Sequence, residues 1–132
     1  MSNNLENSVL LIRVSNLDIH TRPHAWHPPT DLFETDDGYT IRLEVAGMNE
    51  QDFSIQYNQS MLVIMGKRPM LNPKCAYHRM EISSGEFFTT VQMPDNIDIE
   101  HASAEYDRGF LTIEIPRKLP VNIEINNDGG ND

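Results

Sequence analysis

The residues of this chain best suited to metal binding or nucleophilic chemistry are four of its five histidines and its single cysteine: His20, His24, His27, His78 and Cys75. His20 and His24 could share one face of a helix and bind a metal ion together. Pro23 lies between them, however, and proline interrupts a helix. No cysteine completes a tetrahedral ligand set nearby. We therefore expect no metal site.

Catalysis has no other sequence motif to support it. The scattered Ser, His and Asp residues match no nucleophile motif such as G-x-S-x-G, and no P-loop pattern indicates nucleotide use. One cysteine cannot form an internal disulfide, which agrees with a reducing compartment. We expect no enzymatic activity and no cofactor.

Size and charge exclude further classes of function. The 132 residues fit one domain, and a formal net charge of −10 opposes binding to nucleic-acid phosphates. The longest apolar run, Met61 to Met65, is far shorter than the roughly 20 residues that span a bilayer. The polar start, Met1 to Asn7, lacks the order of a signal peptide. We expect a cytoplasmic protein with no nucleic-acid partner and no membrane span.

The elements that position any site are predicted to be strands. Apolar and polar residues alternate over Tyr39 to Val45 and Phe53 to Tyr57, and further strand candidates run from Met61 to Met65 and from Phe87 to Met93. Turn signals separate these segments, and helical periodicity is lacking. This pattern predicts an all-β protein with an antiparallel sandwich.

The strongest hairpin signal lies near the end of this region. Three apolar residues precede the turn Asp107-Arg108-Gly109 and three follow it, namely Ala102, Ala104 and Tyr106, then Leu111, Ile113 and Ile115. We expect a three-residue loop in which Gly109 adopts the positive φ.

The N-terminal segment is more apolar than a solvated tail requires. Its apolar residues are Leu10, Leu11, Ile12, Val14, Leu17 and Ile19. They favour either a short helix or strand packed on its own domain, or an arm that contacts other chains. Pro23, Pro28 and Pro29 place the boundary of this arm near Trp26.

One motif resembles a known family. The segment Ala104-Glu105-Tyr106-Asp107-Arg108-Gly109-Phe110-Leu111-Thr112-Ile113-Glu114-Ile115-Pro116 is similar to the signature of the small heat shock proteins and their α-crystallin domain. Supporting matches are Val45-Ala46-Gly47-Met48, Met65-Gly66-Lys67-Arg68 and Tyr77-His78-Arg79-Met80-Glu81. The resemblance covers roughly Pro28 to Ile125 and implies an immunoglobulin-like sandwich.

The resemblance also implies a strand-swapped homodimer. The segment Tyr77 to Ile82 has strand-like content but no obvious local partner, between a Pro-rich stretch and the turn Ser83-Ser84-Gly85. By analogy its residues Tyr77, His78, Arg79, Met80, Glu81 and Ile82 pair with Asp31, Leu32, Phe33 and Glu34 of a second subunit. The alternative is a loop folded back on its own subunit. Thr89 and Thr90 stand where many relatives carry arginine, so charge pairing at the dimer edge is not carried over.

A tail motif implies assembly beyond the dimer. Ile123 and Ile125 lie on one side of any extended chain and resemble the family's I-x-I motif. By analogy they dock into a groove of another subunit lined by Ile55, Tyr57, Ala102 and Ala104. The alternative is a last edge strand of the same domain. The chain thus divides into an N-terminal arm (1–26), a sandwich domain (27–117) and a C-terminal extension (118–132), with flexible ends.

The function implied is that of an ATP-independent holdase chaperone in the stress response. Such a protein binds destabilised clients and prevents their aggregation. The candidate client-binding residues are the six apolar arm residues given above. The rival interpretation is a monomeric binding module resembling the CS-domain co-chaperones, which have neither the separate Tyr77 to Ile82 strand nor the I-x-I tail.

Overall fold

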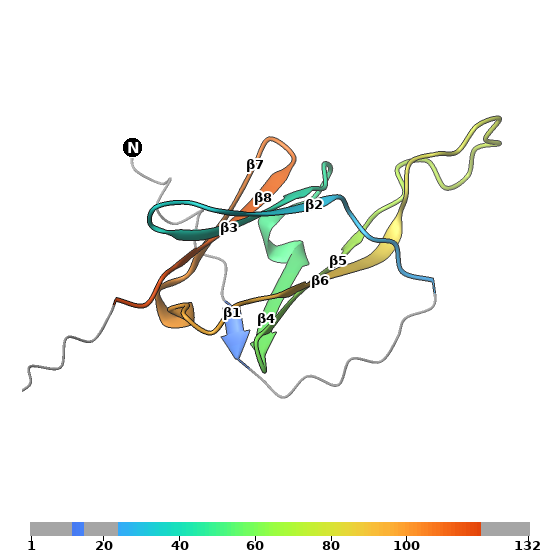
Figure 1. Ribbon diagram of the computed structural model, residues 1–132. Coiled ribbons are helices and arrows are strands. Elements are labelled where there is room, and N and C mark those ends of the chain that lie inside the picture. The colour runs from blue at the N-terminus through green and yellow to red at the C-terminus, as the bar shows by residue number, and fades with distance from the viewer. Residues whose placement is uncertain (1–11, 15–23, 120–132) are drawn as a thin grey trace, which may run out of the picture.

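Two four-stranded sheets form the body of the protein (Figure 1). The computed structural model describes residues 12–14 and 24–119. One sheet has the order β1-β4-β5-β6, with β1 (Ile12–Val14), β4 (Phe53–Asn58), β5 (Met61–Arg68) and β6 (Gly85–Gln92). The other has the order β2-β3-β8-β7, with β2 (Thr30–Glu34), β3 (Gly38–Glu44), β7 (Ser103–Asp107) and β8 (Phe110–Pro116). Short 3₁₀ turns η1 (Glu50–Asp52) and η2 (Ile99–His101) precede β4 and β7.

The predicted all-β antiparallel sandwich is confirmed. Every pair of strands is antiparallel except β1 with β4. The alternation of apolar residues explains the packing, because successive residues of a strand face opposite sides of the sheet. Ile41 and Leu43 on β3 pair with Ile113 and Leu111 on β8, and all four are fully buried. Each such side chain stabilises the fold by about 1.5–3 kcal/mol.

The hairpin between β7 and β8 differs from the prediction at its turn. Asp107 pairs directly with Phe110, so only Arg108 and Gly109 form the loop. Both have positive φ, 52° and 87°, which is the type I′ turn that suits the twist of two strands. The expected three-residue loop was wrong because Arg108 also adopts the left-handed conformation.

The segment before β2 links the two sheets. Trp26 pairs with Phe87 in a parallel bridge, donating its N–H to the Glu86 carbonyl and accepting from the Phe88 N–H. The chain then crosses to the other sheet and enters β2 at Thr30, whose hydroxyl donates to the Thr89 hydroxyl. Trp26 therefore packs against the body of the domain.

The connection between β5 and β6, residues 69–84, projects from the sandwich (Figure 1). Every residue from 71 to 83 is exposed, and no strand forms within this connection. We call residues 69–84 the projecting segment.

Candidate functional site: two strand edges and a projecting segment

The outer edge of β2 presents unpaired backbone groups. The Glu44 N–H donates to the Pro29 carbonyl, and Thr35 and Gly38 exchange both backbone hydrogen bonds. Because hydrogen-bonded and non-hydrogen-bonded pairs alternate in an antiparallel ladder, the backbone groups of Thr30, Leu32 and Glu34 point away from β3. Within the part of the chain that the structure describes, no strand pairs with them. This edge can therefore accept another strand.

Apolar side chains accompany this edge. Leu32 pairs with the buried Ile41 and so lies on the core-facing side, yet it is 46% exposed. Phe33 lies on the opposite face, 40% exposed, with the Arg42 guanidinium 5.5 Å from its ring centre. The edge combines free hydrogen-bonding groups with uncovered apolar surface.

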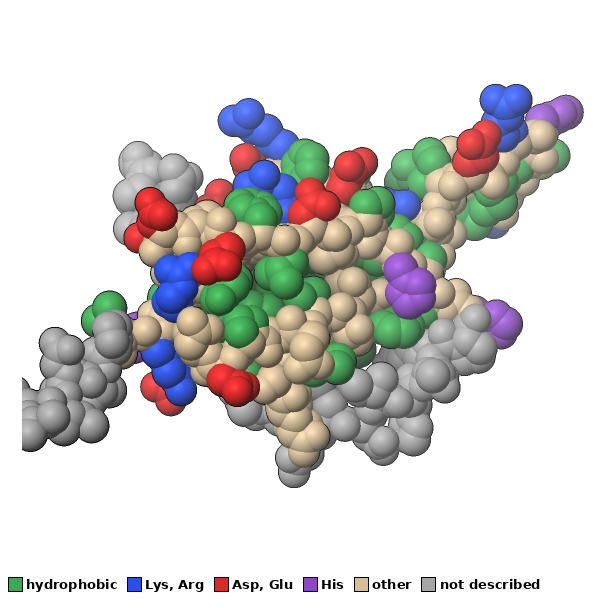
Figure 2. Space-filling view, viewed as in Figure 1, with side chains coloured by type: hydrophobic (Ala, Val, Ile, Leu, Met, Phe, Trp, Pro, Cys, Tyr) green, Lys and Arg blue, Asp and Glu red, His purple; other side chains and the backbone are tan. Residues whose placement is uncertain are grey.

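The projecting segment carries exposed apolar side chains along its length (Figure 2). These are Leu71, Tyr77, Met80 and Ile82. Arg79 and Glu81 form an exposed ion pair at 3.4 Å. The residues predicted to form a swapped strand, 77–82, are thus exposed and belong to no strand in one chain. Their pairing with Asp31, Leu32, Phe33 and Glu34 of another subunit stays a prediction.

Arg68 fastens the base of the projecting segment. Its Nε and Nη2 donate to the Ser83 carbonyl at 2.9 and 2.6 Å, and its Nη1 donates to the Ala46 carbonyl at 3.2 Å. The guanidinium also stacks over the Trp26 ring, 4.4 Å from its centre. An apolar hollow of about 530 Å³ opens here between the two limbs of the segment and the turn at Gly47. The Arg68 side chain therefore joins the segment to the Ala46 carbonyl and to Trp26.

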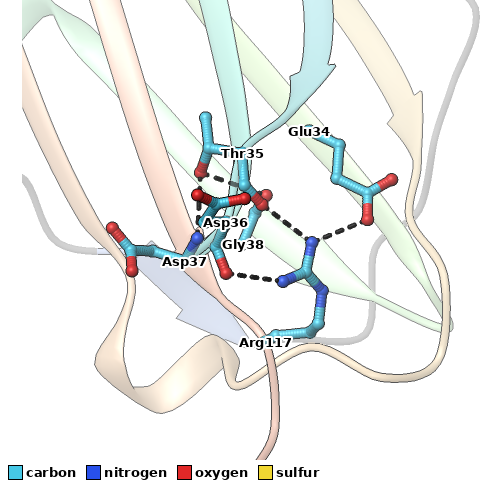
Figure 3. A network of polar contacts seen from close by, with 6 residues as sticks. All are labelled: Glu34, Thr35, Asp36, Asp37, Gly38 and Arg117. Atoms are coloured by element: carbon cyan, nitrogen blue, oxygen red, sulfur yellow. Dashed lines mark hydrogen bonds and ion pairs between the residues drawn. The ribbon is translucent and has the colours of Figure 1, made fainter.

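Arg117 fastens the turn between β2 and β3 (Figure 3). Its Nη2 donates to Glu34 Oε2 at 2.6 Å and to the Thr35 carbonyl at 2.9 Å, and its Nη1 donates to the Asp36 carbonyl at 2.9 Å. Its backbone N–H donates to the Asp37 carbonyl at 3.0 Å. The end of β8 is thereby tied to the end of the open-edged strand.

The same contacts set the charge state of Arg117 and the path of the chain after β8. The hydrogen bond with Glu34 raises the pKa of Arg117 above its ordinary value, against a smaller opposing effect of desolvation. The guanidinium is therefore a permanent positive charge beside Glu34, because arginine is not deprotonated in proteins. The next residue, Lys118, donates its N–H to the Asn96 carbonyl. The backbone hydrogen bonds of Arg117 and Lys118 thus fix the direction in which the C-terminal extension begins.

The second candidate surface is the outer edge of β4, where a groove was predicted. Ile55 and Ala104 are buried in the core, whereas Tyr57 and Ala102 pack on it and are partly exposed. Here β4 and β7 approach each other from the two sheets, and the rings of Phe53 and Tyr106 lie 5.1 Å apart. The four predicted groove residues therefore lie in the core or pack against it, and their role in docking stays a prediction.

The described structure covers only part of the predicted arm and none of the tail motif. Ile12 and Val14 lie on β1, which pairs with β4 in parallel. Ile123 and Ile125 lie outside the described residues, as do Leu10, Leu11, Leu17 and Ile19. The roles predicted for them stay predictions.

Among the described residues, no group of three or more His, Cys, Asp or Glu side chains could hold a metal ion. His27 Nδ1 lies 2.7 Å from the Phe88 carbonyl, and its ring packs edge-on against Phe88. Cys75 and His78 lie exposed on the projecting segment. No helix in the described part is long and apolar enough to cross a membrane.

Sequence reasoning missed the roles of Arg68 and Arg117. Arg68 entered only as part of a family motif, and Arg117 only as part of the chain after the last strand. Each arginine stands at the end of a predicted strand next to a proline, with Pro69 after Arg68 and Pro116 before Arg117, and this position is the signal that could have marked them.

Comparisons with known proteins agree with this architecture. The family described as "Hsp20/alpha crystallin family" matches residues 31–127. The chain is 33% identical to Small heat shock protein C2 of Rickettsia felis over 69% of this chain and 60% of that protein. It is 35% identical to the 17.7 kDa class II heat shock protein of Arabidopsis thaliana over 70% of this chain and 61% of that protein. The matched region thus spans about 60% of the length of these relatives.

Solved structures show the same fold. HSP18.5 from E. histolytica has a TM-score of 0.64 and 26% identity, covering 76% of this chain and all of the other, 100%. A small heat-shock protein from Xylella fastidiosa has a TM-score of 0.66 and 25% identity, covering 77% and 98%. The family match extends over most of the sequence, and the sandwich described above is the fold of these relatives. The chain therefore belongs to the Hsp20/alpha crystallin family of small heat shock proteins.

Proposed function

We propose that this protein is an ATP-independent holdase chaperone, which binds unfolding proteins and keeps them soluble. The observation that carries the proposal is the match of the Hsp20/alpha crystallin family to residues 31–127. The uncovered apolar surface on the projecting segment and β2 agrees with a protein that contacts other chains. Surface of this kind on a soluble protein marks a site of protein contact.

The physical logic needs no energy source. A protein that binds unfolded chains removes them from the pool that aggregates, because exposed apolar surface drives that aggregation. The net charge of −10 keeps the resulting complexes apart and in solution. The proposal includes no catalytic step and no cofactor, and it places the protein in the cytoplasm.

The basic unit we propose is a strand-swapped homodimer. Residues 77–82 of one subunit would add to the outer edge of β2 in the other, where Thr30, Leu32 and Glu34 present backbone groups. A loop bound to its own subunit finds less support, since 71–83 are exposed.

Larger assembly would use the C-terminal extension. In this proposal Ile123 and Ile125 dock beside Ile55 and Tyr57, with Ala102 and Ala104 completing the site. Each buried isoleucine stabilises the contact by about 1.5–3 kcal/mol, while ordering each tail residue costs about 1–2 kcal/mol. One contact is therefore weak and reversible, and many contacts in one assembly hold together.

Each of the three segments of the chain has its own role in this proposal. Residues 27–117 form the sandwich, 118–132 link subunits, and the arm, 1–26, supplies client contacts through its apolar residues. The alternative, a monomeric module like the CS-domain co-chaperones, is not favoured by the family match.

The test combines molar mass with activity. Light scattering behind size-exclusion chromatography is run beside an aggregation assay that contains a heat-labile client and no ATP. We expect an oligomer that suppresses aggregation. A stable monomer that leaves client aggregation unchanged would contradict the proposal.

The matched variant changes the tail alone. Replacing Ile123 and Ile125 by Gly should reduce the assembly toward dimers while circular dichroism and the Tm stay unchanged. The control replaces Asn126 and Asn127 by Gly, which leaves the apolar pair intact. An unchanged molar mass in the Ile variant rules out the docking role of the tail.

A further inference from the structure

The outer edge of β4 already has a partner from the same chain. β1 runs parallel to it, with Ile12 opposite Ile55 and Val14 opposite Tyr57. Ile55 and Tyr57 are the two β4 residues assigned above to tail docking. The N-terminal arm thus occupies the place that the tail needs.

Backbone geometry makes the two occupants exclusive. The loop between β4 and β5 is a two-residue turn, with φ of 50° at Gln59 and 66° at Ser60, so it closes on the hydrogen-bonded pair Asn58 and Met61. By alternation along the ladder, the backbone groups of Ile55 and Tyr57 point away from β5, toward β1. The β4 edge has one row of outward-pointing backbone groups, so only one strand can pair with it at a time.

The two segments also share a sequence pattern. Ile12-Arg13-Val14 and Ile123-Glu124-Ile125 both place a charged residue between two β-branched apolar residues. The central charges are opposite, and in a chain of net charge −10 the positive one is the favoured neighbour.

We propose that Ile12–Val14 is an internal competitor that occupies the β4 edge and blocks docking of the Ile123–Ile125 tail. The inference rests on the tail docking proposed above and adds its regulation. Residues that pair with β4 are withdrawn from clients, and a client that captures the arm opens the edge to a tail. Client binding and assembly are thereby coupled, and by linkage each strengthens the other.

Peptide binding measures the competition. A fluorescein-labelled peptide of residues 118–128 is titrated with full-length protein whose own tail carries Ile123→Gly and Ile125→Gly, and anisotropy reports binding. Adding Ile12→Ser and Val14→Ser should tighten binding about tenfold if the arm holds the edge about 90% of the time. The matched control, Leu17→Ser with Ile19→Ser, changes two other apolar arm residues and should leave the affinity unchanged.

A reversible cross-link tests the register without weakening the arm. In the Cys75→Ser background, Arg13→Cys and Gln56→Cys place thiols on paired residues. Neighbouring strands lie about 4.8 Å apart, within the Cα separation that a disulfide spans. Oxidised glutathione should close the bond within one chain and abolish peptide binding, and dithiothreitol should restore it.

The outcomes separate the two proposals. Equal peptide affinity with and without the arm substitutions, together with binding to the cross-linked form, overturns the competition while tail docking stands. No binding to any variant, including the one with Ile12→Ser and Val14→Ser, overturns tail docking and the competition with it. A cross-link that forms only between chains on a non-reducing gel overturns the assignment to the same subunit.

Discussion

The outer edges of β2 and β4 belong to different sheets and differ in what covers them. The outer edge of β4 pairs with β1 of its own chain, whereas the described residues supply no partner for the outer edge of β2. Both edges carry apolar residues, with Leu32 46% exposed on β2 and Ile55 buried on β4. The uncovered β2 edge is suited to pairing with a second copy of the chain. The β4 edge is covered by β1, so access to it can be regulated. In the proposals above, the β2 edge forms the dimer and the β4 edge regulates docking of the tail.

The largest effects are expected when proline replaces either of two adjacent residues on β2, which tests whether its outer edge forms the dimer. Phe33 belongs to the hydrogen-bonded row facing β3, so Phe33→Pro removes a ladder hydrogen bond and should lower the free energy of unfolding by about 1–3 kcal/mol. The backbone N–H of Leu32 points away from β3, so Leu32→Pro should keep the fold and abolish the dimer. Urea unfolding and light scattering measure the two effects.

Two controls sharpen the proline test. Leu32→Ala removes the side chain but keeps the outward N–H, and it should weaken the dimer without abolishing it. A chain with residues 72–83 replaced by a short Gly-Ser linker should also be monomeric, yet mixing it with the Leu32→Pro chain should yield heterodimers. Each partner then supplies what the other lacks. Failure of the mixture to form heterodimers would argue against a reciprocal swap.

The next largest effect concerns the base of the projecting segment. Arg68→Met removes the bonds to the Ser83 and Ala46 carbonyls, so the segment loses its fixed direction. We expect the dimer dissociation constant to rise about tenfold, because roughly one strong hydrogen-bonding group is lost. Sedimentation at a series of dilutions measures it. Binding of the tail peptide at the β4 edge should not change, and a parallel loss there would remove the distinction between the edges.

A smaller effect is expected where the two sheets meet near β4. The Tyr106 hydroxyl donates to the Val45 carbonyl at 2.9 Å and accepts from the Met48 N–H at 3.2 Å. Tyr106→Phe should therefore lower the free energy of unfolding by about 1 kcal/mol. Dimer mass and tail-peptide affinity should both match the parent protein. A change in dimer mass or in tail-peptide affinity would mean that Tyr106 contributes to one of the two edges and not only to the core.

The smallest effect is expected at Arg117. Arg117→Lys keeps the positive charge. A lysine ammonium lacks the planar guanidinium that donates to Glu34 and to the carbonyls of Thr35 and Asp36 at the same time. We expect a slight fall in Tm and a broader distribution of oligomer sizes, because the tail leaves the domain less uniformly. Native mass spectrometry measures that distribution. An unchanged distribution would mean that the Arg117 contacts do not influence assembly.

Local patterns predicted most of the sandwich. Alternation located the inward residues of β3 and β8, such as Leu43 and Ile113, because burial on one face imposes a period of two. The turn at Arg108 was misjudged, since the left-handed conformation of a non-glycine residue depends on the hairpin that surrounds it.

The contacts that define the two edges were not accessible from local patterns. Arg117 and Glu34 are separated by 83 residues, and the Trp26 indole and the Gly85 carbonyl by 59. Which backbone groups of β2 point outward depends on how the turn at Thr35 and Gly38 closes. Composition and alternation do not determine how this turn closes, so the outward-pointing backbone groups of β2 could be located only from the structure.

Trp26 gives the molecule a built-in optical reporter. It is the only tryptophan in the chain, and its indole donates to the Gly85 carbonyl, packs 5.3 Å from the Phe87 ring and lies beneath Arg68. Its emission therefore comes from a single environment at the root of the projecting segment. Subunit exchange, client capture and heating could each be followed in unlabelled protein by the colour and lifetime of that one fluorophore.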